Sequence, residues 1–200
     1  MRRARYQSDP FTDLLFNALL GFTFLFLVAI MFMNPEAKSG IIDPKAEYIL
    51  TVTWADNNPD DIDVWVEDPE GQVIWFRNPA AGLLHLDRDD RGMLNDTITI
   101  NGEKVQNPLN QEVVTLRGVV RGEYVVNLHY YATQTHKPDD VQVRLVKVNP
   151  ALEVIYYNTV TLSKVGEEKT ALRFTIGADG KVSNINFLPK SLVTVSSSRQ

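Results

Sequence analysis

A run of twenty residues without a formal charge, residues 14–33, constrains this 200-residue chain more than any other feature of its sequence. At about 1.5 Å per residue, a helix of this length covers roughly 30 Å, which is the thickness of the hydrocarbon core of a bilayer. Only Asn17, Gly21 and Thr23 interrupt its apolar side chains. The run therefore predicts a single transmembrane helix, placed at residues 11–34.

The charges on either side of this run predict its orientation. Arg2, Arg3 and Arg5 precede it, and no comparably basic cluster follows it closely. Because basic flanks stay on the cytoplasmic side, residues 1–10 are expected in the cytoplasm and the rest of the chain outside it. A cleaved signal peptide is the alternative. Its apolar core runs roughly 7 to 15 residues before a small-x-small site, whereas this longer run ends in the bulky IMFMNP.

Beyond the helix the apolar pattern changes to period two, in short segments rich in β-branched and aromatic residues. The turn sequences DPEG, NG and ADG separate several of them. Antiparallel strands without intervening helices predict a sandwich or a barrel. The predicted strands are 47–54, 61–67, 72–77, 96–100, 112–118, 123–131, 141–148, 153–162, 170–176 and 181–187.

The expected fold is thus a single N-terminal transmembrane α-helix followed by an all-β antiparallel sandwich. Residues 35–46 are predicted to be a linker, residues 47–188 the periplasmic sandwich and residues 189–200 a flexible tail. The chain has no cysteine, so no disulfide staples this domain and its stability must come from a hydrophobic core. About 150 residues are enough to bury one.

A polar stripe runs along the predicted helix. Asp13, Asn17 and Gly21 follow one another at four-residue steps, so they lie on one slowly winding face. Lipid satisfies neither the carboxylate nor the amide, and a glycine allows another helix to approach closely, so the stripe predicts a helix partner. A local explanation of Asp13 stays open: with Ser8 or Asp9 as N-cap, an acid in the first turn is stabilised by roughly 0.3–1 kcal/mol.

The segment PFTDLLFNALLGFTFLFLVAIMFMNP resembles the transmembrane helix of the B-type subunits of proton-driven motors, which include the flagellar stator B subunit, ExbD, TolR and the Zorya B subunit. Pro10, Phe11, Asp13 and Pro35 occupy the matching positions. The resemblance implies that Asp13 carries the transported H⁺ and that two such helices form a homodimer inside a ring of multi-span MotA-like or ExbB-like A subunits. The predicted lining of the helix pair comprises Asn17, Gly21 and Thr23.

A second resemblance covers residues 48–176. The segments that carry it are DIDVWVEDPEGQVIWFRNP, LHLDRDDRG, GEYVVNLHYYA and VQVRLVKVN. They are similar to the β-sandwich family known as DUF2135 or YfaP-like, which implies the fold but no activity. Trp65 stands where histidine is common in that family, and the loop after Asp90 lacks the family's longer glycine-rich continuation.

Acidic residues gather in two places of the predicted sandwich. Asp61 and Asp63 share a face of one strand, while Asp87, Asp89 and Asp90 crowd a predicted loop. Because Ca²⁺ takes six to eight oxygen ligands, these five residues are a candidate calcium site. The spacing of these acids is not that of an EF-hand. The alternative is that they are acidic residues at strand ends, exposed to solvent and without a ligand.

Four aromatic residues of the sandwich are either core or a recognition patch. Alternation places Trp65 opposite Ile62, Val64 and Val66, which favours a surface or interface position for it. Core positions are expected for the others. These are Trp54, Trp75 and Phe76.

Signals for catalysis and for nucleic-acid binding are missing from the sequence. It contains no G-x-S-x-G, P-loop or H-E-x-x-H, and His85, His129 and His136 lack metal-ligand spacing. A formal net charge of −5 without a basic stripe argues against nucleic acid. No enzyme activity and no required cofactor are therefore expected.

Three functions remain open on these patterns. The first is a proton-driven motor or energy-transducing subunit of the bacterial inner membrane, whose sandwich transmits force or binds an unknown periplasmic target. The second is a membrane-anchored periplasmic binding module without ion transport. The third, ranked lowest, is an extracytoplasmic hydrolase. A peptidoglycan-binding OmpA-like domain, which flagellar and Zorya B subunits carry, is not recognisable in the sequence.

Overall fold

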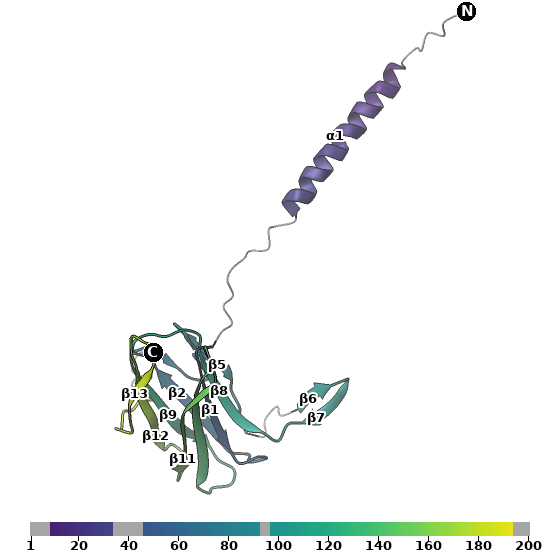
Figure 1. Cartoon of the computed structure of the whole chain (residues 1–200). Helices are drawn as coiled ribbons and strands as arrows, with labels where there is room; N and C mark the ends of the chain where they lie inside the picture. Colours follow the sequence, from purple (N-terminus) through teal and green to yellow (C-terminus); the bar gives the residue numbers. More distant parts are fainter. Residues whose placement is uncertain (1–8, 34–45, 93–96, 194–200) are drawn as a thin grey trace, which may run out of the picture. The chain divides into compact units, whose positions relative to one another are not determined.

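The computed structural model describes residues 9–33, 46–92 and 97–193 (Figure 1). They belong to two separate compact units, Met1–Asp43 and Pro44–Gln200. In the described residues, the first unit consists of helix α1 (Pro10–Met33) and the second contains all the strands. The predicted fold class, one N-terminal apolar helix followed by an all-β antiparallel domain, is confirmed. The predicted linker lies outside the described residues except for its last position, residue 46.

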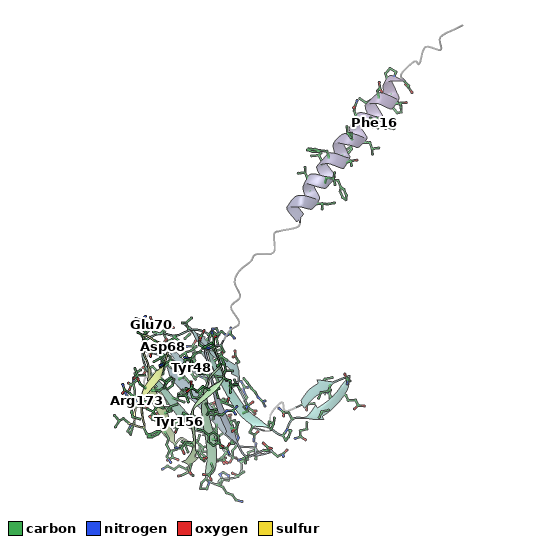
Figure 2. The ribbon with its side chains drawn as sticks, viewed as in Figure 1. Phe16, Tyr48, Asp68, Glu70, Tyr156 and Arg173 are labelled. Atoms are coloured by element: carbon green, nitrogen blue, oxygen red, sulfur yellow. The ribbon has the colours of Figure 1, made fainter. Side chains whose placement is uncertain are left out.

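Helix α1 begins at a side-chain cap. Asp9 Oδ1 accepts the Phe11 backbone N–H at 3.1 Å, and Asp9 Oδ2 accepts the Thr12 hydroxyl at 3.0 Å, which satisfies donors that a helix N-terminus leaves free. Nearly all of its described side chains are exposed, and Phe16 stands out from the ribbon in Figure 2. Over Pro10–Ile30 the helix is long and apolar enough to cross a membrane, and a signal sequence meets the same criteria.

The second unit contains thirteen strands among the described residues, paired antiparallel throughout. They are β1 (Tyr48–Trp54), β2 (Asp61–Glu67), β3 (Val73–Ile74), β4 (Ala80–Ala81), β5 (Leu84–Arg88), β6 (Thr97–Ile100), β7 (Glu103–Gln106), β8 (Asn110–Leu116), β9 (Gly122–Ala132), β10 (Asp139–Lys147), β11 (Glu153–Leu162), β12 (Glu168–Ile176) and β13 (Val182–Asn186).

Two larger sheets make a sandwich. One has the order β11-β10-β1-β8-β5-β4 and the other β13-β12-β9-β2-β3, while β6 and β7 form a separate hairpin (Figure 1). Alternate residues of the central strands fill the space between the sheets, as the period-two pattern predicts. The buried core includes Tyr48, Leu50 and Val52 from β1, Val114 and Leu116 from β8, Ile62, Val64 and Val66 from β2, and Tyr124, Val126 and Leu128 from β9.

The three predicted turns are confirmed by their backbone geometry. Asn101 and Gly102 have φ values of 52° and 87°, the left-handed pair that a tight hairpin requires, and they join β6 to β7. In DPEG the Gly71 N–H donates to the Asp68 carbonyl at 3.0 Å. In ADG the Gly180 N–H donates to the Gly177 carbonyl at 3.1 Å.

Strand boundaries differ from the prediction around the acidic run. The predicted strand 72–77 shrinks to the two residues of β3, because Trp75 and Asn78 bridge each other and turn the chain away. Residues 84–88, which the sequence suggested were a loop, form β5 and pair with β8. Pairing with β8 is therefore the tertiary contact that makes residues 84–88 a strand despite their polar composition.

The segment of residues 189–193, here called the C-terminal strap, is packed onto the second sheet, contrary to the predicted flexible tail. Leu192 is fully buried against Trp65 and Val125. Residues 194–200 lie outside the described residues. The surface position favoured for Trp65 is also wrong. Trp65 points away from the main core, as alternation requires, but the C-terminal strap covers it and leaves only 3% of the residue exposed.

Glu168 on β12 anchors the strap through hydrogen bonds. Its Oε1 accepts the backbone N–H groups of Leu192 at 2.6 Å and Val193 at 3.2 Å, and its Oε2 accepts the Ser191 hydroxyl at 2.6 Å. The Asn127 side-chain amide donates at 2.6 Å both to Glu168 Oε1 and to the carbonyl of Lys190. Burial alone would raise the pKa of Glu168, but these hydrogen bonds outweigh it and lower the pKa.

Candidate functional site

The edge of strand β2 is left uncovered over its first half. Strand β3 pairs only with Val66 and Glu67, so no described strand flanks Asp61–Trp65 on that side. The Val64 backbone N–H is satisfied by a side chain from the other sheet: it donates to Glu112 Oε2 at 2.5 Å. Glu112 shares the inward face of β8 with Val114 and Leu116 and is 1% exposed.

Beside this edge lies a pocket of about 240 Å³. Asp61 and Asp63, on the outer face of β2, line it together with Asp89 and Arg91 from the segment after β5. Carboxylate oxygens of Asp63, Asp89 and Glu112 all lie within 4.8 Å of one another. Two sheets and a loop thus bring four acidic side chains to one place.

Three carboxylates of this pocket contain buried oxygens without a hydrogen-bond partner among the described residues. These atoms are Asp61 Oδ1, Asp63 Oδ2 and Glu112 Oε1. The nearest basic side chains make weak contacts: Arg91 Nε lies 3.4 Å from Asp89 Oδ2, and His129 Nδ1 lies 3.7 Å from Asp63 Oδ2, too far for a hydrogen bond. Such buried, unpaired acceptors are rare in folded proteins and call for a ligand, a proton or water.

The pocket disfavours the charged forms of its acids. Burial, and after it the negative charges of Asp63 and Asp89, raise the pKa of Asp61 to about 7. Burial likewise raises the pKa of Asp63, and it raises the pKa of Glu112 well above its usual range, with the neighbouring carboxylates adding to the effect. A cation that binds these acids must replace their protons, so its binding is expected to weaken as the pH falls.

A glycine positions the loop that supplies Asp89. Gly92 has φ of +65°, and a Cβ atom on it would lie 2.6 Å from the carbonyl oxygen of Pro59. The backbone after β5 therefore packs directly on the backbone that leads into β2. Only glycine permits this approach, which brings the acidic loop next to Asp61.

Two acids of the predicted calcium site are used elsewhere. Asp87 accepts hydrogen bonds from Thr115 Oγ1 at 2.6 Å and from Arg117 at 2.8 Å, across the β5–β8 pair. Asp90 pairs with Arg88 at 2.7 Å and accepts the Gln111 N–H. Both carboxylates bond to residues at β5 and β8, and neither lines the pocket. Of the five predicted ligands, the structure groups only Asp61, Asp63 and Asp89.

A row of aromatic rings connects the strap with the pocket. Trp65 stacks on Trp75 at 4.5 Å between ring centroids, Trp75 contacts Phe76 edge-on at 4.9 Å, and Phe76 contacts Tyr131 at 5.4 Å. Phe76 and Tyr131 form the apolar wall of the pocket, so the core position expected for Phe76 is wrong. The prediction for Trp54 is confirmed, since it is buried in the main core.

The polar stripe of α1 is described only within its own helix. Among the described residues, the side chains of Asp13 and Asn17 have no hydrogen-bond partner, and the space beside Gly21 is open. Thr23 donates to the Leu19 carbonyl at 2.8 Å and lies about 160° around the helix from Gly21. Thr23 therefore stands outside the stripe that the other three define.

Sequence reasoning did not assign the pocket residues Arg91 and Tyr131, nor Glu112 and His129, which lie beside Asp63. The alternation of β8 contained the signal for Glu112, because a glutamate two residues before Val114 and four before Leu116 must face inward with them. His129 was not predictable without the pairing of β9 with β2, which sets it opposite Asp63. Comparison of the chain with protein-family models, with curated proteins and with solved structures finds no match.

Proposed function

We propose that this chain is a B-type subunit of a proton-driven motor or energy-transducing complex in a bacterial inner membrane. Its N-terminus lies in the cytoplasm, α1 crosses the membrane and the β domain lies in the periplasm. The observation that supports the proposal best is Asp13, an acid in the first turn of an exposed apolar helix that Asp9 already caps. The helix N-terminus does not need a second acid as its cap.

The polar stripe supports a helix partner. An unpaired carboxylate, an amide and a glycine on one face of an otherwise apolar helix are costly in lipid, and contact with other helices removes that cost. Two copies of α1 inside a ring of multi-span A subunits would pack through Gly21. Asp13, about 80° around the helix from Gly21, would then lie at the border of the helix–helix contact, where it can reach the ring. Protonation and deprotonation of Asp13 then alternate between a neutral side chain that tolerates an apolar wall and a charged one that requires a polar partner.

The energy available is adequate for such a step. Moving one proton across a potential of 100 mV releases about 2.3 kcal/mol, and several protons together are enough to move a helix pair against its ring. The β domain, outside the membrane, receives this motion and transmits it or couples it to a periplasmic target. Neither role requires catalysis by the β domain.

The test uses the full chain, purified with its multi-span partner from native membranes and reconstituted in liposomes that contain a pH-sensitive dye. Asp13→Asn is expected to abolish proton flux driven by an imposed potential while the complex remains assembled. Asp9→Asn is the matched control, because asparagine caps a helix as well as aspartate does and removes the same charge one turn earlier. Proton flux unchanged in Asp13→Asn, or a chain that purifies without any multi-span protein, would refute the proposal.

A membrane-anchored binding module without ion transport is the second candidate, and the carboxylate pocket of the β domain favours it. In that case α1 serves only as an anchor. Replacing α1 by an unrelated transmembrane helix distinguishes the two functions. The motor proposal requires that the replacement abolish activity in the native cell, whereas a simple anchor is interchangeable.

A further inference from the structure

We propose that the pocket at the edge of β2 binds one Ca²⁺ ion, with Asp63, Asp89 and Glu112 as its protein ligands and Asp61 beside them. This inference concerns the β domain alone. It holds whether or not Asp13 carries protons, so the two proposals fail independently.

The spacing of the ligand atoms fits the ion. Calcium binds oxygen at 2.3–2.6 Å, so two oxygens on opposite sides of one ion are separated by about 5 Å at most. One oxygen from each of Asp63, Asp89 and Glu112 falls within 4.8 Å of the others. The three side chains therefore need no large rearrangement to reach a shared ion.

Burial and missing partners distinguish this group from solvated surface acids. Glu112 is 1% exposed and Asp63 is 3% exposed, and each has a buried oxygen without a hydrogen-bond partner among the described residues. Glu112 is fixed at its other oxygen by the Val64 N–H, which leaves Oε1 free on the side of the pocket. A pre-positioned carboxylate oxygen of this kind is the ligand that a structural cation requires.

The local charge also lacks compensation. The four carboxylates carry a formal charge of −4 when all are ionised, against the guanidinium of Arg91 and the imidazole of His129, 3.7 Å from Asp63. The Arg91 side chain is 58% exposed, and its ion pair among the described residues is with Asp89, at 3.4 Å. A divalent cation neutralises the interior acids, which Arg91 does not contact.

The donor set selects among cations. All ligand atoms are carboxylate oxygens, which suit hard cations, whereas structural Zn²⁺ sites are built from cysteine and histidine. The open mouth, walled by Phe76 and Tyr131, leaves space for the waters that complete six to eight ligands. Mg²⁺ is usually held by one or two carboxylates and keeps several waters, so a set of three protein carboxylates favours Ca²⁺.

The experiment measures binding to the full chain in detergent micelles. Titration with CaCl₂ by calorimetry is expected to give one site, and Tb³⁺, a luminescent substitute for Ca²⁺, is expected to be sensitised by the nearby Tyr131 and displaced by Ca²⁺. Glu112→Gln keeps an oxygen acceptor for Val64 but removes the charge, and it is expected to weaken binding by at least about tenfold. Asp63→Asn provides an independent second variant, and circular dichroism checks that both fold.

Asp87→Asn is the matched control. It removes a carboxylate from the same acidic run, and the pairing of Asp87 with Arg117 excludes it from the pocket. Its affinity for Ca²⁺ is expected to equal that of the wild type. Three results would overturn the proposal: no Ca²⁺ binding at millimolar concentration, an equal loss in Asp87→Asn, or tighter binding of Zn²⁺ than of Ca²⁺.

Discussion

Replacement of Leu192 by alanine tests whether the C-terminal strap is part of the folded domain. Leu192 is fully buried and packs on Trp65 and Val125, with Trp75 at the border of the cluster. Truncation of a buried leucine costs about 2–5 kcal/mol, and the lower part of that range applies where the surroundings can relax. A five-residue strap can move inward, so we expect the free energy of unfolding to fall by about 2–3 kcal/mol.

The assay is urea unfolding of residues 44–200, followed by tryptophan fluorescence, with thermal unfolding as a second probe. For a domain of this size, each kcal/mol corresponds to a shift in Tm of about 2–4 °C. Leu188→Ala is the matched control, because Leu188 precedes the strap directly but is 64% exposed; its effect should stay within about 0.5 kcal/mol. If the two variants are equally stable, the strap does not cover Trp65 and the description of that face is wrong.

Three further predictions concern other elements. Glu168→Gln should destabilise the domain by about 1–3 kcal/mol at pH 7. Because the pKa of Glu168 is lowered from 4.5, its stabilisation is present above that value and is lost as the pH falls through the lowered pKa, so unfolding curves of variant and wild type should converge in acid. Gly92→Ala should cost more than the roughly 1–2 kcal/mol of its positive φ, whereas Gly102→Ala, with open space around it, should cost only that; equal values by urea unfolding would contradict the backbone contact. The chain has no cysteine of its own, so single cysteines can be cross-linked by oxidation in membranes that contain it. Gly21→Cys should give a disulfide-linked dimer on a non-reducing gel, and Leu19→Cys, on the opposite face of the helix, should not.

Much of the fold follows from the sequence because its causes are local. The helix is long and apolar, the central strands largely alternate, and turns such as Asn101–Gly102 need left-handed residues. The elements that sequence reasoning missed depend on distant partners. β5 is polar and reads as a loop, and it is a strand because β8 lies beside it.

The candidate pocket was predictable only in part, for the same reason. The alternation on β2 places Asp61 and Asp63 on one face, which the structure confirms. Each of the three acids at residues 87–90 has an arginine beside it, so the choice among them depends on which also bonds to β8, and that is a tertiary property. Arg117 reaches Asp87, and Asp89 is left facing the pocket.

The short length of β3 has a consequence for how this domain can change. The acids occupy the space that a longer third strand would fill, and Glu112 substitutes for the missing backbone acceptor. A variant in which that strand grew by two residues would reach Val64, and its backbone would compete with Glu112 for the Val64 N–H.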